Sequence, residues 1–204
     1  MTGQKVWTSG AVSADYALLL ARTDRSKPGR DGLSCFALDM RQPGVRVRPL
    51  RQMSGGYHFN EVFLDDAVVP ESALIGTLGG GFAVLRTMLS SERAAIGGGT
   101  SARSAAQLRT MAKEVGRAAE PIVRQDLARA HTREWLLDMV MSRAASIPAG
   151  GPIIKLLYSE HARLSADAAL EILGASALIA EHPMSEPWLD RFLFAPGLRL
   201  GGGT

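Results

Sequence analysis

The feature that most constrains the fold of this chain is a change of hydrophobic period near Gly76. Before this point, short apolar or alternating runs are bounded by turn residues, as in strands. After it, apolar residues recur every three or four positions, as in helices. We therefore expect an α+β chain in which an antiparallel β-domain, residues 1–76, precedes an all-helical bundle, residues 77–204.

The first part contains five strand-like runs, at residues 5–7, 16–22, 34–40, 45–50 and 59–64. Turns at 28–32 and 42–44 contain proline, which presets φ, and glycine, which permits a positive φ. Such short connections favour antiparallel pairing, because a parallel crossover needs a dozen or more residues. The strict alternation at 45–48 predicts one buried and one solvated face. The β-domain is therefore expected to be an antiparallel barrel or sandwich.

Helical spacing marks the second part. A first helix is expected after the glycines at 79–81, and Pro121 is placed at the start of another, where no N–H is needed. The Gly-Gly-Pro at 150–152 is expected to separate that helix from the next, which Gly174 ends. These helices carry more apolar surface than they can cover mutually, which predicts packing against another subunit.

Composition excludes several classes of protein. The longest unbroken apolar run, 16–21, is too short to cross a bilayer, and the net charge of +3 is spread along the chain instead of forming a basic face for nucleic acid. A single cysteine, Cys35, argues against a secreted disulfide scaffold. We therefore expect a cytoplasmic protein with no membrane span and no nucleic-acid partner.

The four histidines lie too far apart in the sequence for a known metal-binding motif, so no metal site is expected. His131 and His161 fall on apolar helical stripes, where a hydrogen-bonded core or interface histidine is commoner than a ligand. The methionines are interpreted as core packing; they include Met53, Met88, Met111, Met139 and Met141.

Several ordered segments carry a family likeness: GQKVWTSGA at 3–11, FLDDAVVP at 63–70, GGGF at 79–82 with SER at 91–93, DAALEILG at 167–174, and PGLRLGGGT at 196–204. In this order they resemble the middle β-domain and the C-terminal helical domain of acyl-CoA dehydrogenases. Members of that family are longer, with a helical domain in front and a closing helix behind. The chain is therefore expected to be a fragment truncated at both ends.

The resemblance implies FAD-dependent α,β-dehydrogenation of an acyl-CoA thioester. A carboxylate removes the proton beside the thioester carbonyl, and it must be desolvated so that its pKa rises toward the working pH. In many relatives this base precedes the final Gly–Thr, where this chain has Gly202; in others it lies on the first helix of the C-terminal domain, where Glu92 stands. Glu92 is thus the expected base and Arg93 the expected cation beside the substrate, with two solvated surface residues as the alternative.

Trp7, Thr8 and Ser9 resemble the segment that lies along the flavin ring. An indole can shield one face of the ring, and a hydroxyl or backbone N–H can bond near N5 or O4. The alternative is a tryptophan packed in the core of a β-domain.

The dinucleotide half of the site departs from the family pattern. Glu171 and Gly174 stand where relatives approach the FAD of a partner subunit, but Ala175 replaces the second glycine of a pair. The arginine expected on the FAD diphosphate has no counterpart around Glu114, and Arg117 is nearby but out of register.

Two classes of function stay open. The first is an acyl-CoA dehydrogenase that works with an electron-transfer acceptor, as a homo- or hetero-oligomer joined through its C-terminal helices. The second is a partner subunit without FAD activity of its own, which Gly202 and the weakened diphosphate landmarks favour and Glu92 opposes. A third and remote alternative, an unrelated β-plus-helix binding module, is opposed by the order of the landmarks.

Overall fold

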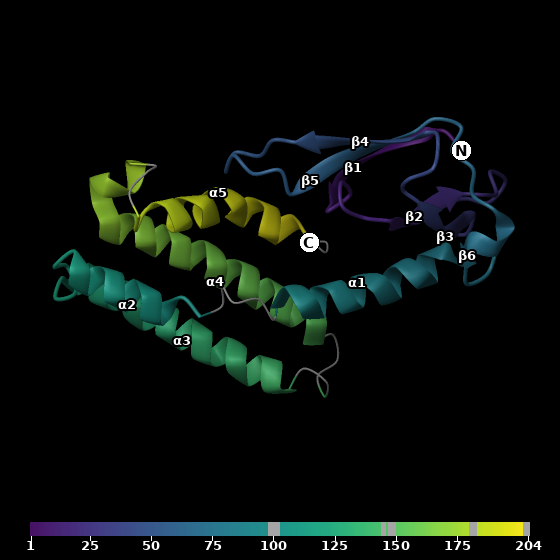
Figure 1. Ribbon diagram of the computed structural model, residues 1–204. Helices are drawn as coiled ribbons and strands as arrows, with labels where there is room; N and C mark the ends of the chain where they lie inside the picture. The colour runs from purple at the N-terminus through teal and green to yellow at the C-terminus, as the bar shows by residue number, and fades with distance from the viewer. Residues whose placement is uncertain (98–102, 144–145, 147–149, 180–182, 202–204) are drawn as a thin grey trace. The chain divides into compact units, whose positions relative to one another are not determined.

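The computed structural model describes residues 1–97, 103–143, 146, 150–179 and 183–201, and of 93–97 the backbone alone. The chain divides into two compact units, Met1–Met88 and Leu89–Thr204. Antiparallel strands fill most of the first unit and helices the second (Figure 1). This confirms the predicted α+β class, while the domain boundary after residue 76 stays a prediction.

The first unit, here called the β unit, contains two antiparallel three-stranded sheets (Figure 1). One has the order β1-β5-β4 and the other the order β2-β3-β6. The strands are β1 (Gly3–Ser9), β2 (Tyr16–Arg22), β3 (Leu33–Asp39), β4 (Val45–Leu50), β5 (Phe59–Leu64) and β6 (Leu74–Ile75). Both sheets contribute side chains to one apolar cluster, which includes Leu19 and Leu38 from one sheet and Val62 and Leu64 from the other. The β unit is therefore built as a sandwich.

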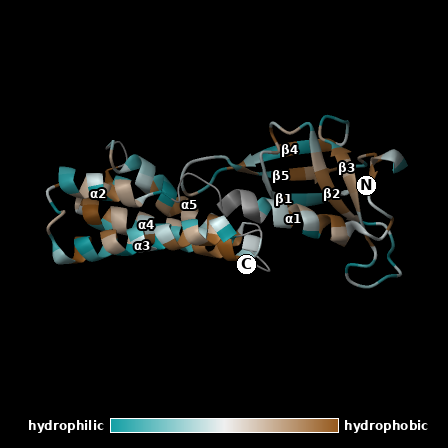
Figure 2. Cartoon of the chain, turned by 90° about the horizontal axis from the view of Figure 1, so that it is seen from below, coloured by the Kyte–Doolittle hydropathy of each residue, from teal (hydrophilic) through white to brown (hydrophobic). Residues whose placement is uncertain are grey.

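Alternation along the strands decides which side chains enter this core. In β5 the residues Asn60, Val62 and Leu64 are buried, and the residues between them are half-buried. In β4 the arginines are exposed and the valines half-buried, as the sequence predicts. Figure 2 agrees, since β3 and β5 are coloured mainly as hydrophobic and β4 mainly as hydrophilic.

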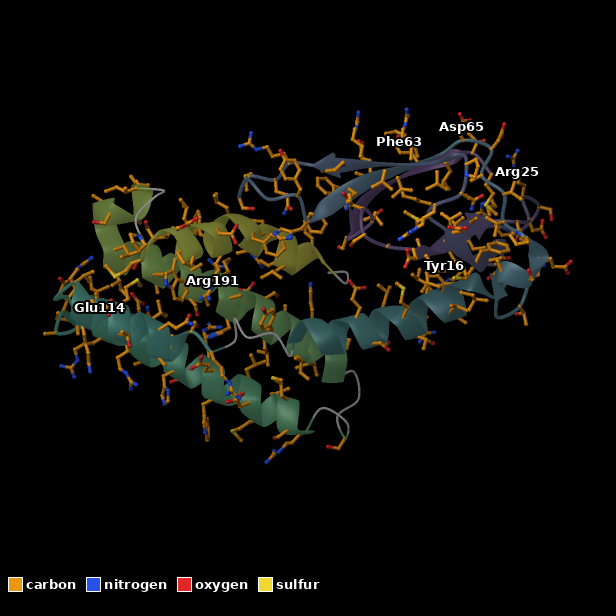
Figure 3. All side chains as sticks on the ribbon, in the orientation of Figure 1. Tyr16, Arg25, Phe63, Asp65, Glu114 and Arg191 are labelled. Atoms are coloured by element: carbon orange, nitrogen blue, oxygen red, sulfur yellow. The ribbon has the colours of Figure 1, made fainter. Side chains whose placement is uncertain are left out.

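The outer face of this sheet carries an aromatic ring between two cations. The guanidinium carbons of Arg46 and Arg48 lie 5.0 Å and 5.4 Å from the centroid of the Phe63 ring, which is labelled in Figure 3. Arg48 also forms an ion pair with Glu61. These long side chains cover the apolar ring while their charges stay in water.

Helix α1 (Gly81–Gly97) begins at a close approach of two backbones. A Cβ atom on Gly81 would lie 2.5 Å from the carbonyl carbon of Ser34 and 2.7 Å from the nitrogen of Cys35. Just before the helix, the nitrogen of Gly79 donates to the Ser34 hydroxyl at 2.9 Å. The glycine run is therefore a packing point of the β unit.

The second unit, here called the helical unit, is organised around one long helix. Its helices are α2 (Ala105–Glu114), α3 (Pro121–Arg143), α4 (Gly150–Leu173) and α5 (Glu186–Leu200), and α4 packs against the other three (Figure 1). The core centres on fully buried residues such as Leu108 and Ile172. As predicted, α3 begins at Pro121, and Gly174 follows the end of α4 with φ +57°.

Some helical predictions were wrong. The Gly-Gly-Pro at 150–152 does not precede α4 but forms its first turn, where a proline lacks no hydrogen bond. His131 is exposed and is not a core histidine of this chain, although Val123 and Ala130 of the same α3 stripe are buried against α4; its place at an interface with another subunit stays a prediction. Met53 is 72% exposed in a turn and contributes nothing to a core.

His161 is a core histidine, as predicted. It is buried on α4, and its Nε2 lies 3.0 Å from the Ser104 hydroxyl. Among the residues that the structure describes, no three histidine, cysteine or acidic side chains gather as metal ligands. Within the same residues, no helix combines the length and apolarity needed to span a membrane.

Candidate functional site

The segment from Trp7 to Ser9 lies at an irregularity of β1. Lys5 pairs with Val62 and Thr8 with Asn60, so two residues of β1 stand opposite the single residue Glu61 of β5. This is a β-bulge, a feature that re-aims side chains and is common beside functional sites. No local pattern predicts this bulge, because Val6 and Trp7 fit a regular strand.

Trp7 has an unusual conformation and an unusual exposure. Its φ is +63°, in the left-handed region, which costs a residue with a side chain about 1–2 kcal/mol. The side chain is nevertheless 66% exposed, and its ring meets that of Phe59 edge-on, with centroids 6.0 Å apart at 85°. Trp7 is therefore not a core tryptophan, and its broad apolar face is open to a planar ligand.

Thr8 follows the bulge and is half-buried. It helps to line a cavity of about 270 Å³ between β1 and β2, together with Lys5, Leu18 and Leu20. The Lys5 ammonium donates to the Leu20 carbonyl across this cavity at 3.2 Å. Ser9 is exposed and pairs with Phe59 at the end of β1.

Glu92 lies on α1, and its side chain is exposed. No described residue of the chain forms a hydrophobic wall around it, so the desolvation that a base requires is not supplied by that part of the chain. The Arg93 side chain and Gly202 lie outside the described residues.

Glu171 lies in the last turn of α4, and Gly174 follows this helix. The Nη1 of Arg117 donates to the carbonyls of Glu171 and Ile172 in that turn, at 2.6 Å and 2.9 Å. The same guanidinium pairs with both carboxylate oxygens of Glu120, at 2.8 Å and 2.7 Å. Arg117 thus caps α4 and closes the turn between α2 and α3, because the last carbonyls of a helix lack internal partners.

This pairing favours the charged form of both groups. Hydrogen bonds from Arg117 lower the pKa of the Glu120 carboxyl, and bonds to Glu120 raise the pKa of the guanidinium. Elsewhere, burial raises the pKa of the Cys35 thiol in β3, which keeps that group protonated and unreactive.

Two domain families match the chain over almost its whole length. They are "Acyl-CoA dehydrogenase, middle domain" over residues 1–67 and "Acyl-CoA dehydrogenase, C-terminal domain" over residues 79–204. The chain therefore belongs to the acyl-CoA dehydrogenase family.

Individual relatives agree with this assignment. The chain is 32% identical to acyl-CoA dehydrogenase FadE34 of Mycobacterium tuberculosis over 212 residues, which covers all of this chain and 29% of the relative. It is 31% identical to acyl-CoA dehydrogenase IpdE1 of the same organism, covering all of this chain and 55% of the relative. Among solved structures, the Tcur3481-Tcur3483 steroid ACAD superposes with a TM-score of 0.86 at 26% identity, covering 99% of this chain and 56% of that one. The chain thus spans about half, or less, of these relatives.

The described residues fit one end of the FAD that the family implies. Trp7 offers the flavin ring an exposed aromatic face. In the dinucleotide half, Gly174 leaves room for a ligand, since within 4 Å a Cβ there would meet Arg117 Nη1 alone, at 3.9 Å. The diphosphate end fits less well, because Arg117 is already engaged by two carbonyls and a carboxylate. The residues therefore suit the flavin ring better than its diphosphate.

Asn60 and Arg117 make hydrogen bonds that no pattern in the sequence predicts. Both join positions more than 50 residues apart, so no local pattern reports them. A signal for Asn60 does exist, because a polar residue takes an inward place in an otherwise apolar alternation.

Proposed function

We propose that this chain is the flavin-facing and helical part of an acyl-CoA dehydrogenase and that Glu92 takes the α proton of an acyl-CoA thioester. The observation that carries the proposal is the match of both domain families, with Glu92 on α1 near the start of the second match. When bound, FAD supplies the acceptor for the β hydrogen, which leaves as hydride.

In this proposal the chain's residues hold the flavin ring and move one proton. Trp7 covers a face of the ring, and the Thr8 and Ser9 hydroxyls or N–H groups bond to its polar edge. Glu171 and Gly174 let a partner subunit's FAD approach the end of α4. Arg93 orders α1 beside the substrate.

Glu92 needs a drier environment than the described residues provide. A carboxylate in water is too weak a base for the α proton of a thioester. The bound thioester, or another polypeptide segment packed over α1, would have to exclude water and raise its pKa. Activity is therefore expected to depend on such a covering.

The remaining partners follow from the same proposal. Exposed apolar side chains on α3 and α4, among them Trp135, Leu136 and Leu156, support oligomer formation through the C-terminal helices. An electron-transfer acceptor would reoxidise the flavin, and a cytoplasmic location stays a prediction.

A partner subunit without its own FAD activity is the second candidate. Two observations favour it: Arg117 is committed to capping α4, and Glu92 is exposed. Such a subunit would support a complete relative through its helices and would not turn over substrate itself.

The deciding experiment is a visible absorption spectrum of the purified chain before and after addition of FAD, followed by desalting. Retained flavin bands support the enzyme, and a colourless protein supports the partner subunit.

For a flavin-loaded protein, a second experiment compares the turnover of acyl-CoA thioesters by Glu92→Gln with that by the wild type. Steroid-derived thioesters are included because a relative is described as a steroid ACAD. Loss of turnover is expected in Glu92→Gln and full turnover in Glu114→Gln, an exposed glutamate on α2; retained turnover in Glu92→Gln would sink the assignment.

A further inference from the structure

A polar side chain occupies the inward row of β5, where the sandwich otherwise buries apolar groups. Asn60 is only 1% exposed, and its neighbours in the row, Val62 and Leu64, belong to the apolar cluster of the β unit. Burying an amide is unfavourable unless its polar atoms are bonded. An apolar residue would pack here without that cost, so the amide needs an explanation.

Half of the amide is used at the bulge of β1. The Nδ2 of Asn60 donates a hydrogen bond to the carbonyl of Thr8 at 3.0 Å. Thr8 and Asn60 are the first residues of β1 and β5 that pair again after the bulge. The Oδ1 of Asn60 is buried without a hydrogen-bond partner among the described residues. The contact with Thr8 is therefore the one polar interaction that this side chain provides there.

The adjoining residue explains why such a contact is needed. Trp7 holds a left-handed φ of +63°, which is unfavourable for a bulky residue, and its ring is too exposed for burial to offset this. A strained conformation persists only when its surroundings over-determine it. The hydrogen bond from Asn60 fixes the carbonyl of the next residue and so removes the freedom to relax.

We propose that Asn60 is a positioning residue: its amide locks the β1 bulge and thereby holds the Trp7 ring outward and the Thr8 backbone in place. The significance of this placement for flavin binding rests on the proposed function. The lock, that is, the effect of the Asn60 hydrogen bond on the β1 bulge, does not depend on that function and can be tested on the flavin-free chain.

The test uses ¹⁹F NMR of the full chain labelled with 5-fluorotryptophan. The chain has three tryptophans, and Trp7→Phe identifies the resonance of Trp7. In Asn60→Leu we expect the Trp7 resonance to shift or broaden while those of Trp135 and Trp188 keep their positions. Val62→Ala, a neighbouring change in the same inward row, should lower stability and leave the Trp7 resonance in place. An unmoved Trp7 resonance in folded Asn60→Leu overturns the proposal.

A second variant decides the matter even where Asn60→Leu does not fold. In Asn60→Asp the introduced carboxyl can donate to the Thr8 carbonyl only while protonated, and burial raises its pKa. The Trp7 resonance should therefore be native-like at acid pH and displaced at higher pH. The wild-type chain, carried through the same series, separates this change from any effect of pH that the native chain shares. A Trp7 resonance in Asn60→Asp that follows the wild type at every pH contradicts the lock.

Addition of FAD separates this proposal from the proposed function. If the resonance changes as expected and FAD leaves the Trp7 signal of the wild type unmoved, the lock stands and the flavin role of Trp7 fails. If FAD moves the Trp7 signal of the wild type, and the Trp7 resonance of flavin-free Asn60→Leu keeps its wild-type position, the flavin role stands and the positioning role fails.

Discussion

In the β unit, the buried amide of Asn60 and the buried hydroxyl of Ser34 serve irregular points of the backbone, whereas in the helical unit several buried polar side chains join one helix to another. The Asn60 amide donates a hydrogen bond to the Thr8 carbonyl at the bulge of β1, and the Ser34 hydroxyl accepts one from the backbone nitrogen of Gly79, just before α1. In the helical unit, Ser104 at the start of α2 bonds to His161 and Ser165 on α4. The partners in the second case are regular helices.

The difference follows from where each structure makes its backbone hydrogen bonds. Strands bond to their neighbours, so a regular sheet already joins its elements and side chains are needed only where the ladder breaks. Helices satisfy their own backbone and leave only their ends unbonded. Polar links between helices therefore come from side chains, as with Lys155 on α4, which donates to the Arg199 carbonyl near the end of α5 at 2.5 Å.

The largest losses of stability should come from removing buried apolar side chains, and they should be equal in the two units, because the contrast between the units concerns polar groups alone. Leu38 in the β unit and Leu108 in the helical unit are 2% and 0% exposed. Each change to alanine should lower the free energy of unfolding by about 3 kcal/mol, through lost burial and the cavity left behind. Urea denaturation measures this, with Leu78→Ala and Leu178→Ala as exposed controls that should cost less than about 0.5 kcal/mol.

The next effect tests the close approach in the β unit. Gly81→Ala would push a Cβ atom against the backbone of Ser34 and Cys35, which has no flexible end to move aside. We expect a loss of about 1–3 kcal/mol, as for overpacking. Gly3→Ala meets no atom within 4 Å and serves as the control. Equal stability of the two variants would show that the start of α1 shifts freely.

Local signals predicted the β unit well. The runs at 16–22, 45–50 and 59–64 coincide with β2, β4 and β5, because alternation and turn residues act over a few positions. In the helical unit, Pro121 and Gly174 marked two helix ends for the same reason. The exposure of His131 was less predictable, since a sequence stripe does not show how far a neighbouring helix covers it: Val123 and Ala130 of the same stripe are buried and His131 is not.

The candidate site was less predictable than the fold. A flavin-facing role for Trp7 follows from a family likeness, but its positive φ and its exposure do not follow from any pattern in β1. The contacts of Asn60 with Thr8 and of Arg117 with Glu171 join positions 52 and 54 residues apart. Only the folded chain brings such groups together.

A smaller effect should come from the polar link between α2 and α4. Ser104→Ala removes the hydroxyl that contacts both His161 and Ser165, at 3.0 Å and 2.7 Å. The expected cost is about 1–2 kcal/mol, because each buried group then loses a partner. Ser142→Ala, which removes an exposed hydroxyl on α3, should cost less than about 0.5 kcal/mol. If urea denaturation shows no loss of unfolding free energy in Ser104→Ala, buried polar side chains do not stabilise the contact between α2 and α4, and the contrast between the units fails.

The smallest effect is a dependence on pH that both units share. Hydrogen bonds from Ser26 lower the pKa of the Asp24 carboxyl in the β unit, as those from Arg117 lower that of Glu120 in the helical unit. A carboxyl whose folded-state pKa is lowered stabilises the fold above its unfolded-state pKa, and this contribution is lost as the pH falls through the folded-state pKa.

Stability should therefore decline on the acid side of the ordinary carboxyl range, and added salt should weaken the Glu120 contribution because the pair is exposed to solvent. Urea denaturation of Arg117→Gln and Ser26→Ala across the acid range measures each contribution. Each variant should flatten part of the acid decline. Below that range Ser26→Ala should match the wild type, whereas Arg117→Gln should stay less stable because it also loses the bonds to the carbonyls at the end of α4. Salt should matter less for Ser26→Ala, whose lost hydroxyl bond comes from a neutral residue. An acid decline as steep in Arg117→Gln as in the wild type would mean that the guanidinium only caps α4 and does not hold the charge of Glu120.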